Sequence, residues 1–316
     1  MNLSLFAVAA LFLVCETYNI AIFLPATFAN SQIIFSRRVG EVLSKAGHNV
    51  TIFMIHHFEF EYQKFESEEP IHVVDVNSST GRNATEFLNL QTDMTYKNLP
   101  MWDTKMREAM TRQAEVYKTC GMIASNTSLH NLIIDSKFDI AFTHMFDICA
   151  VGLIHVTKIP TWIWLSSGVL MENMAHAISV PVPPSYCPPV MMDAGERMNV
   201  WERIKSFVGH IVSRIGYRKM VAGPETAAFR EHFGQDFPDL ADLAAKAPLV
   251  MVNTHELYDF ARPTLHKIIN IGGVGMKKED AKNLMGEFAR RTEQAKDGVI
   301  LFSFGSIAPV YNMPDS

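Results

Sequence analysis

Short apolar runs recur along the chain, and the stretches between them carry apolar positions at a helical period. Such runs, rich in Val, Ile and Phe and bounded by Gly, Pro or Asn, are typical of buried strands. We predict strands at 19–24, 50–55, 71–76, 138–143, 160–165, 248–254 and 267–273. Helices are predicted at about 31–46, 101–125, 146–158 and 200–221. This alternation predicts an α/β fold, a Rossmann-like parallel sheet flanked by helices.

The first strand, the first helix and the second strand form a βαβ unit. Pro25 is expected to end the first strand. Ser31 is expected to cap the helix, because its hydroxyl can accept a backbone N–H that the first turn leaves unpaired. Gly47 offers the left-handed position that ends the helix. Ligands of such sheets bind at the carboxyl ends of strands, so the loop 26–32 is the first candidate for chemistry.

A second βαβ unit follows, and its strand-to-helix corner, 143–147, should lie on the same rim of the sheet as the first loop. The proline-rich segment 180–189 can hold no regular element, because prolines remove backbone donors and fix φ, so it is predicted to be a long crossing or a lid. The charged stretch 277–297 is predicted to be a linker. The run 298–306 is predicted to begin a strand of a second domain.

Two helical patterns leave alternatives open. Met and aromatic positions between 101 and 125 favour core packing over a ligand surface. The helix at 200–221 combines an apolar side with Arg and Lys positions around it. That pattern fits a helix lying on a membrane surface and equally a surface helix packed on its own domain.

Composition narrows the function classes. The 316 residues carry 28 basic and 33 acidic side chains, a net charge of −5, which argues against a general nucleic-acid surface. Residues 1–18 resemble a secretory signal, and no later apolar segment is long enough to span a membrane. On the secretory route, Asn77, Asn83 and Asn126 become candidate glycosylation sites, with Asn49 the poorest because it borders a buried strand.

Cysteine and histidine positions do not indicate a metal site. Cys120, Cys149 and Cys187 lie outside the presumed signal; we interpret them mainly as buried thiols, with one bridge possible. His56 and His57 lack a third ligand of convincing spacing, so rim or acceptor-pocket residues are the better interpretation. The glycines at 272–275 lack the spacing of a dinucleotide site. No metal or cofactor is predicted.

Several segments together resemble the animal UDP-glucuronosyltransferase family. These are 251–273 followed by 299–306, the Ser31 helix start, 46–51, Phe138-Asp139, Ile159-Pro160 and 184–186, in order and spacing from residue 19 to the end. The resemblance implies a GT-B architecture. In it an N-terminal domain binds a small lipophilic acceptor and a C-terminal domain binds a UDP-sugar, UDP-glucuronate or UDP-glucose, as co-substrate. The implied reaction is an inverting sugar transfer.

The resemblance also locates the catalytic positions, and here the chain departs from the pattern. The family's base is a histidine directly after the residue matching Ser31, and this chain has Gln32, an amide without useful basicity. The acidic partner position is occupied by His144, with Asp147 one helical turn further on. Either His144 acts as the base, oriented by Asp147 or hydrogen-bonded by Gln32, or His144 is a polar rim residue and catalysis is lost. Gly305 and Ser306 match the family's nucleotide-phosphate turn.

The resulting expectation divides the chain into a signal (1–18), an acceptor-binding domain (19–276), a linker (277–297) and the first strand of a UDP-sugar-binding domain (298–316). Glucuronosyl or glucosyl transfer to lipophilic molecules is expected of the family. This chain alone is expected to bind acceptors without transferring sugar. The alternative is a non-catalytic module of the endoplasmic reticulum lumen that pairs with related transferases, as a homo- or hetero-oligomer.

Overall fold

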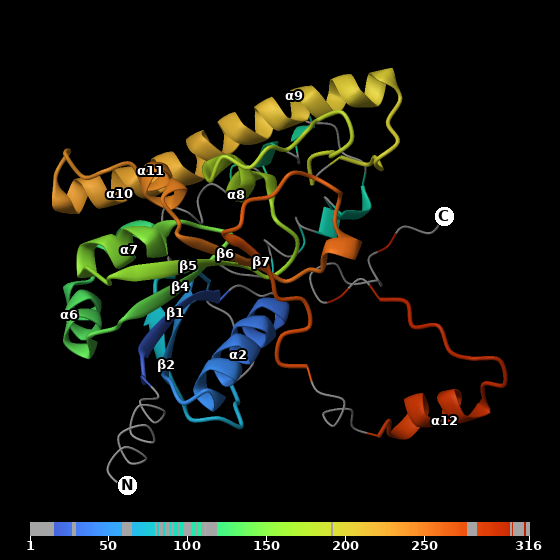
Figure 1. The fold of residues 1–316 in the computed structure, drawn as a ribbon, viewed down its shortest axis with the longest axis horizontal. Coiled ribbons are helices and arrows are strands. Elements are labelled where there is room, and N and C mark those ends of the chain that lie inside the picture. Colours follow the sequence, from blue (N-terminus) through green and yellow to red (C-terminus); the bar gives the residue numbers. More distant parts are fainter. Residues whose placement is uncertain are drawn as a thin grey trace, which may run out of the picture.

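Seven parallel strands form one sheet in the computed structural model, in the order β3-β2-β1-β4-β5-β6-β7 (Figure 1). The structure describes residues 16–26, 30–58, 65–79, 119–190, 192–276, 283–303, 305 and 313, and scattered positions between 81 and 111. The strands are β1 (Asn19–Ala26), β2 (Asn49–His56), β3 (Ile71–Asn77), β4 (Ile140–His144), β5 (Thr161–Ser166), β6 (Leu249–Val252) and β7 (Ile268–Asn270). All seven predicted strands are present, and the predicted α/β class is confirmed.

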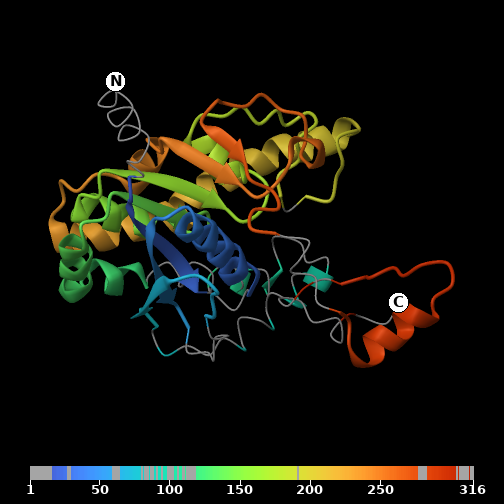
Figure 2. The ribbon, with the colours of Figure 1, turned by 60° about the horizontal axis from the view of Figure 1, so that its bottom comes forward.

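Helices cover both faces of the sheet. On one face lies α2 (Asn30–Lys45), and on the other lie the helices that join the later strands (Figure 2). The latter are α5 (Cys120–Ala124), α6 (Thr127–Ser136), α7 (Cys149–Thr157), α8 (Glu172–Ala177), α10 (Gly223–Phe233) and α11 (Leu240–Ala245). The long helix α9 (Val200–Tyr217) contacts α8 on the outside of this layer and continues into the π-helix η1 (Arg218–Ala222). A 3₁₀ turn, η2 (Glu256–Tyr258), follows β6.

The alternation of side chains along β1 divides the buried interior into two cores. Ile20, Ile22 and Leu24 face α2, whereas Ala21 and Phe23 face the layer that contains α7 and α10. Successive strand residues point to opposite faces of a sheet, so a continuous apolar run is what a strand covered on both sides needs. The run therefore fits the position of β1 inside the sheet, between β2 and β4.

Pro25 does not end the first strand. β1 continues to Ala26, and Pro25 lies in register with Ile55 of β2. The pairing of β1 with β4 stops at Phe23, opposite Thr143. Beyond Phe23 the strand therefore has a partner on one side only, and a proline that lacks an N–H is tolerated there as it is on an edge strand. Gly47 does adopt the left-handed conformation after α2, with φ of 92°.

The predicted strand at 298–306 is not formed in its described part. Residues 298–303 have no regular structure, and Ile300 is 96% exposed. No described strand lies beside them, and a strand without a partner leaves its backbone groups unpaired. The stretch predicted as a linker contains one helix, α12 (Gly286–Gln294), which lies apart from the sheet and its helices (Figure 1).

Other predicted helices agree in part with the structure. The helices near 31–46, 146–158 and 200–221 are present as α2, α7 and α9 with η1. Of the helix predicted at 101–125, residues 104, 107, 108 and 111 are helical and α5 is present at the end, while residues 112–118 lie outside the described residues. The proline-rich segment 180–189 contains no helix or strand, as predicted. None of the described helices is long and apolar enough to cross a membrane.

Candidate functional site

The order of the sheet reverses between β1 and β4, which are neighbours although β2 and β3 separate them in the chain. In parallel α/β sheets, ligands bind in the crevice outside the carboxyl ends of the strands at such a point. Ala26 ends β1 here and His144 ends β4. The loop after β1 and the corner after β4 therefore share one rim, as predicted, although residues 27–29 of that loop lie outside the described residues.

The first turn of α2 presents the Ser31–Gln32 pair at this rim. The helix begins at Asn30, so Ser31 lies inside its first turn and is exposed. The predicted role of Ser31 as the cap of this helix is therefore wrong, because a capping residue lies just before the first helical residue and the helix already includes Asn30. Gln32 is 7% exposed. The side chain in the position of the family's base is thus a buried amide.

The His144 ring is enclosed at the end of β4. Its side chain is 2% exposed and stacks on Phe146, with ring centroids 5.1 Å apart and planes inclined by 22°. Neither ring nitrogen has a hydrogen-bond partner, so His144 forms no hydrogen bond with Asp147 or Gln32 in this structure. Burial lowers the pKa of His144 to about 3. The ring is neutral at physiological pH and is a weak base as it stands.

Asp147 lies just before α7 and accepts hydrogen bonds from the first backbone N–H groups of that helix. The backbone N–H groups of Cys149 and Ala150 stabilise its charged form, while burial raises its pKa to about 6. A second carboxyl that the sequence did not indicate lies beside it: Glu225 of α10, 1% exposed, accepts the backbone N–H of Ile148 at 3.0 Å. Burial and the charge of Asp147 raise the Glu225 pKa well above its usual value. Two acids thus meet at the helix N-terminus, where the dipole favours negative charge.

His56 ends the strand β2 and His57 follows it, and the two side chains lie in different environments. His56 Nε2 lies 2.7 Å from Asp75 Oδ1 at the surface. His57 is buried with its Nδ1 2.7 Å from Thr119 Oγ1, and burial lowers its pKa to about 4. No cluster of three metal-binding side chains occurs among the residues that the structure describes. Both histidines lie at the rim; a role in an acceptor pocket stays a prediction.

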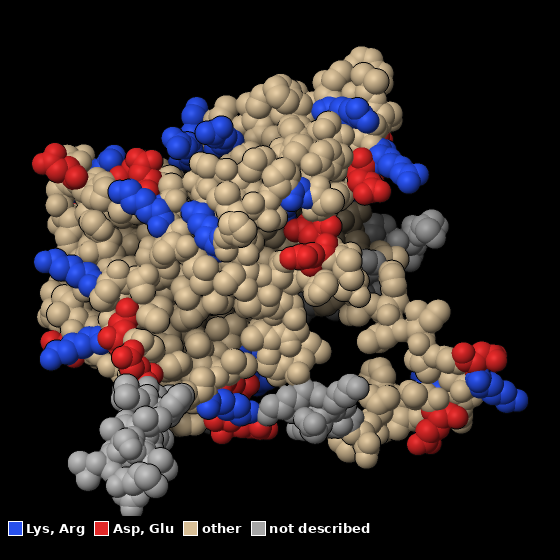
Figure 3. All heavy atoms as spheres, viewed as in Figure 1, with Lys and Arg blue, Asp and Glu red and all other residues tan. Residues whose placement is uncertain are grey.

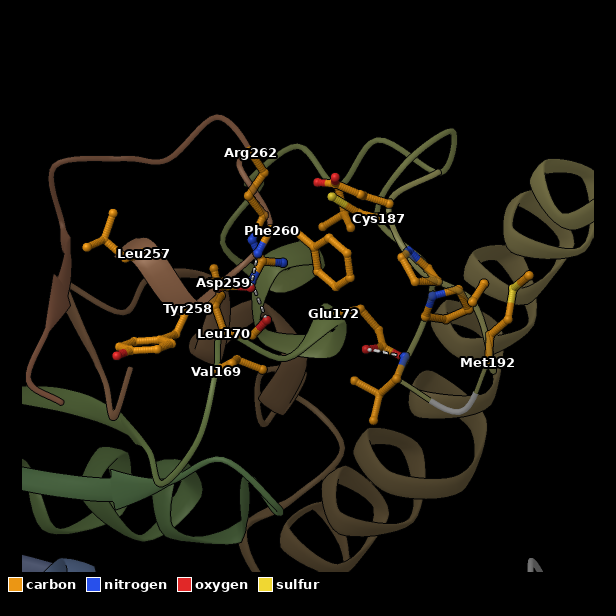
Figure 4. A pocket seen from close by; sticks show the side chains of 16 residues that line it. Val169, Leu170, Glu172, Cys187, Met192, Leu257, Tyr258, Asp259, Phe260 and Arg262 are labelled. Carbon is orange, nitrogen blue, oxygen red and sulfur yellow. Dashed lines mark hydrogen bonds and ion pairs between the residues drawn. The ribbon is translucent and has the colours of Figure 1, made fainter. Parts of the chain in front are cut away.

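A cavity of about 620 Å³ opens at the same edge of the sheet, where the chain leaves β5 and β6 (Figure 4). One wall is the proline-rich crossing, and the opposite wall is the segment after β6, from which Phe260 extends into the space. The lining residues are Val169, Leu170, Glu172, Val182, Cys187, Pro188, Pro189, Val190, Met192, Ala194, Glu196, Leu257, Tyr258, Asp259, Phe260 and Arg262. Gln32, His144 and Asp147 are not among them.

One buried ion pair supplies polarity to this largely apolar cavity. Arg262 and Asp259 lie 2.8 Å apart, and their side chains are 8% and 16% exposed. Arg262 also donates to the backbone carbonyl of Leu170 at 2.9 Å. These contacts join the two sides of the cavity, because Leu170 follows β5 and Arg262 follows β6. A paired charge held in place in this way can orient a polar group of a ligand.

The remaining predictions concern the cysteines, the candidate glycosylation sites and the nucleotide-phosphate turn. Cys120 and Cys149 form a disulfide, so the possible bridge is present, and only Cys187 is a free, buried thiol among the described cysteines. Asn77 is exposed at the end of β3, and Asn126 caps α6 by accepting the Leu129 N–H. Asn83 and Ser306 lie outside the described residues. Gly305 lies in a turn with φ of 76°.

Comparison with known proteins assigns the chain to a family. The sequence profile of the UDP-glucoronosyl and UDP-glucosyl transferase family matches residues 22–316. The chain belongs to this family. A Caenorhabditis elegans relative named "Putative UDP-glucuronosyltransferase ugt-48" is 29% identical over 95% of this chain and 56% of its own length. "UDP-glucosyltransferase 2" of Dactylopius coccus is 26% identical over 87% of this chain and 51% of its own length.

Solved structures similar to this UDP-glycosyltransferase chain include complexes with nucleotides. LpCGTa in complex with UDP is 11% identical, covers 82% of this chain and 53% of its own, and gives a TM-score of 0.37. Medicago truncatula UGT71G1 complexed with UDP-glucose is 10% identical, covers 77% of this chain and 47% of its own, and gives a TM-score of 0.35. The chain spans about half the length of the curated relatives it matches.

Proposed function

We propose that this chain supplies the acceptor-binding half of a UDP-glycosyltransferase and binds small lipophilic molecules in the cavity between β5, β6 and the proline-rich crossing. The observation that carries the proposal is the cavity itself: about 620 Å³, largely apolar, at the carboxyl edge of the sheet in a member of this family. Pockets of this size suit drug-sized ligands, which bury most of their surface against apolar walls.

The chemistry of the cavity favours an acceptor with one polar end. Val169, Leu170 and Phe260 offer apolar contact, and the Arg262–Asp259 pair lies at the cavity wall. An acceptor hydroxyl is neutral and small, so it can hydrogen-bond to a paired charge without breaking the pair. A UDP-sugar is the co-substrate that the family assignment implies, and we propose that its nucleotide binds outside this half.

We further propose that this chain alone does not transfer sugar. Gln32 cannot accept the hydroxyl proton, and His144, with a pKa of about 3, is a weak base at physiological pH. For His144 to act as the base, its ring would have to leave its contact with Phe146 and form a hydrogen bond with Asp147 or Gln32; we call this arrangement the rearranged dyad. That movement would raise the pKa of His144, because a carboxylate and solvent both stabilise the charged ring.

Binding is tested by titrating the purified chain with 4-methylumbelliferone, a fluorescent planar phenol. Phe260→Ala removes an aromatic wall of the cavity and should weaken binding by about tenfold, as expected for losing one buried aromatic contact. Phe233→Ala is the matched control, since Phe233 of α10 is similarly exposed, 42% against 38%, but lies outside the cavity lining. Equal affinities for the wild type and both variants would refute binding in this cavity.

Transfer is tested separately, with radiolabelled UDP-glucose and UDP-glucuronate and the same phenol. No product above background is expected. Turnover by the purified chain would disprove the inactivity proposal while leaving the acceptor site intact.

A second candidate, a non-catalytic module that pairs with related transferases, is favoured by residues 299–302. These four apolar side chains, Val299 to Phe302, are 60% to 96% exposed and form no strand in this structure. An exposed apolar segment of high strand propensity that forms no strand within its own chain is suited to pairing with a strand of another chain. Co-purification with a full-length relative that is lost in Ile300→Lys would support this function, and pairing unaffected by Ile300→Lys would count against it.

We also propose a lumenal, secretory location, supported by the Cys120–Cys149 disulfide, since such bonds persist in oxidising compartments. The predicted signal lies mainly outside the described residues. Expression in a secretory cell should yield chains whose gel mobility shifts on glycosidase treatment, and Asn77→Gln should reduce that shift by one glycan. A chain without glycan or disulfide would contradict this location.

A further inference from the structure

The long helix α9 carries its apolar side away from the protein. Eight apolar side chains of α9 are 45% to 73% exposed, although most amphipathic surface helices bury such residues against their own domain. They are Val200, Trp201, Ile204, Phe207, Val208, Ile211, Val212 and Ile215. Spacings of three and four residues place them on one side of the helix. We call this set the α9 apolar stripe.

The opposite side of α9, which contacts the protein, is polar or small. Ser206 and His210 are its buried residues, at 0% and 5% exposure. His210 Nε2 lies 2.8 Å from the Cys187 carbonyl oxygen, and Ser213 Oγ donates to Glu172 at 3.3 Å. Gly209 faces the proline-rich crossing so closely that an added Cβ would lie 2.8 Å from Pro189 Cγ.

These contacts fix the orientation of the helix. A rotation that buried the apolar stripe would break the hydrogen bonds of His210 and Ser213 and would remove the glycine from its close contact with Pro189. Of the two interpretations that the sequence left open, packing of the apolar side on the chain's own domain is therefore wrong for this structure.

Basic side chains flank the α9 apolar stripe. Five exposed Lys and Arg residues lie between positions 203 and 219, against a single acid, Glu202, whose carboxylate is used to accept the Asn199 N–H at 2.7 Å. The five are Arg203, Lys205, Arg214, Arg218 and Lys219. Figure 3 shows an uncharged band along α9 with basic side chains toward both of its ends. This local charge is opposite to the net charge of −5 of the chain.

We propose that α9 docks on an anionic lipid surface, with the apolar stripe entering the headgroup–acyl boundary and the flanking cations meeting lipid phosphates. The chemistry is that of interfacial helices, which combine an apolar face, an aromatic residue and basic flanks. Trp201, 73% exposed near the start of the helix, has an apolar body and a polar N–H suited to that boundary.

A second copy of this chain is the less suitable occupant. Two stripes facing each other around a two-fold axis would bring the basic flanks of both helices into contact, and like charges across an interface oppose association. Lipid phosphates instead supply the complementary charge along the whole length of the stripe.

The experiment is vesicle flotation of the purified chain. Binding is expected to vesicles of phosphatidylcholine with about a third phosphatidylserine, and binding should fall by about tenfold on pure phosphatidylcholine, because attraction of the cations to anionic lipid is lost. The triple variant Trp201→Ser, Ile204→Ser, Phe207→Ser should abolish flotation. Arg214→Glu with Lys219→Glu should weaken binding to the anionic vesicles to the level seen on neutral ones.

The matched control places three serines at exposed apolar positions elsewhere: Met285→Ser, Phe288→Ser and Leu301→Ser, which are 71% to 83% exposed in the wild type. It should float like the wild type. All the altered side chains are exposed, so circular dichroism and thermal unfolding should stay unchanged in every variant.

Membrane depth gives an independent measurement. In chains that carry Trp102→Phe, brominated lipids should quench the fluorescence of the bound protein, and Trp201→Phe should remove most of that quenching, because the two other tryptophans, Trp162 and Trp164, are buried. The proposal is overturned if the chain does not float on anionic vesicles, or if the control variant loses binding as fully as the stripe variant. A dimer in sedimentation that the stripe variant disrupts, without flotation of the wild type, would assign the stripe to a second copy.

Discussion

At the end of β4, the His144 ring lies against Phe146 with both nitrogens unbonded. Its pKa of about 3 is below the usual 6.5, so between these values the unfolded chain binds a proton that the folded chain does not. Stability must fall as the pH drops through 6.5, by about 2 kcal/mol at pH 5 for this residue alone.

His144→Phe tests this assignment. The ring stacking is kept and the titrating group is removed, so the loss of stability between pH 7.5 and pH 5, measured by urea unfolding, should shrink by about 2 kcal/mol. At pH 7.5 the variant and the wild type should differ little. An unchanged pH dependence would mean that the histidine is solvated and available as a base.

Glu225 predicts the opposite pH dependence. Its pKa is raised by burial and by the charge of Asp147, so the folded chain holds a proton that the unfolded chain releases once the pH exceeds about 4.5. Stability from this group is present below that pH and is lost as the pH rises toward the folded pKa.

Glu225→Gln should therefore stabilise the chain at pH 7 to 8, with little change at pH 4. The amide oxygen can still accept the Ile148 N–H. Glu231→Gln, an exposed position on the same helix, controls for the loss of one negative charge. If both variants change the melting temperature equally, the effect is one of overall charge and not of burial.

Sequence reasoning could place residues at the rim but not their environments. His144 and Asp147 were predicted at one strand-to-helix corner, and the strand and helix boundaries confirm that placement. The environment of His144 depends on Phe146, which stacks on its ring, and on Trp164 of β5, which donates to its backbone carbonyl. The role of Asp147 depends on where α7 begins. The sequence did not indicate that Glu225 belongs to this site, because acidic residues are common in the first turn of a helix. Only the packing of α10 shows that its side chain is buried.

At the scale of elements, the disulfide connects α5 to α7 across 29 residues of chain. Cross-linking a loop of that length restricts the unfolded chain and should contribute about 3 to 4 kcal/mol. We expect Cys120→Ala with Cys149→Ala to lower the unfolding free energy by that amount in urea titrations. Cys187→Ala removes a buried thiol without a cross-link and should cost much less; similar losses for the two would argue that packing, and not the bridge, is responsible.

The contact between α7 and α10 depends on the absence of a side chain at Gly152. A Cβ there would lie 2.5 Å from two ring carbons of Phe229, which is 0% exposed. Gly152→Ala should destabilise the chain by about 1 to 3 kcal/mol, because the overpacked ring must move. Adding Phe229→Leu should restore part of the lost stability. A double-mutant cycle of the two substitutions measures this coupling free energy.

The control for this contact is Gly121→Ala in α5, where no atom lies within 4 Å of the added methyl group. That change should be neutral or should stabilise the helix by up to about 1 kcal/mol. Destabilisation equal to that of Gly152→Ala would show that the backbone, and not the Phe229 ring, is the cause.

Helices and strands were predicted well where burial alone determines the order of apolar and polar residues. They were predicted less well where the outcome depends on which neighbouring element they contact. The inner strands β1, β2, β4 and β5 are buried and need apolar runs, so the pattern alone identified them. The prediction that Pro25 ends the first strand considered only the missing N–H of proline. The strand tolerates Pro25 because its pairing with β4 stops at Phe23, so no partner on that side needs the N–H. The amphipathic pattern of α9 is the same whether its apolar side faces inward or outward, and only the contacts of His210 and Ser213 distinguish the two.

At the scale of the whole molecule, the topology brings two separate features to one edge of the sheet. The reversal of strand order between β1 and β4 holds Gln32 and His144 at the rim, and the ends of β5 and β6 hold the cavity. Under the proposed function, acceptor binding and proton transfer would therefore fail independently. Changes in the cavity should alter ligand affinity, while changes at positions 32 and 144 should alter transfer only when a nucleotide-binding half is present.

A chimera that joins this chain to the C-terminal half of the Dactylopius coccus UDP-glucosyltransferase 2 tests the rim directly. By the family resemblance, Gln32→His with His144→Asp places the base and its acidic partner in their family positions. The double variant should exceed the parent chimera in glucosyl transfer by about 100-fold or more, the range that a positioned acid–base group contributes. Each single variant should stay near the parent, because one lacks the orienting acid and the other lacks the base.

The opposite outcome is equally informative. If the parent chimera transfers glucose and His144→Ala abolishes this, the ring must leave its contact with Phe146 when the second half is present, and the rearranged dyad is the working base. The pH profile separates the cases: a ring held as in this structure, with a pKa of about 3, would give rates independent of pH between 5 and 7, whereas a ring paired with Asp147 would lose activity as the pH falls through its raised pKa.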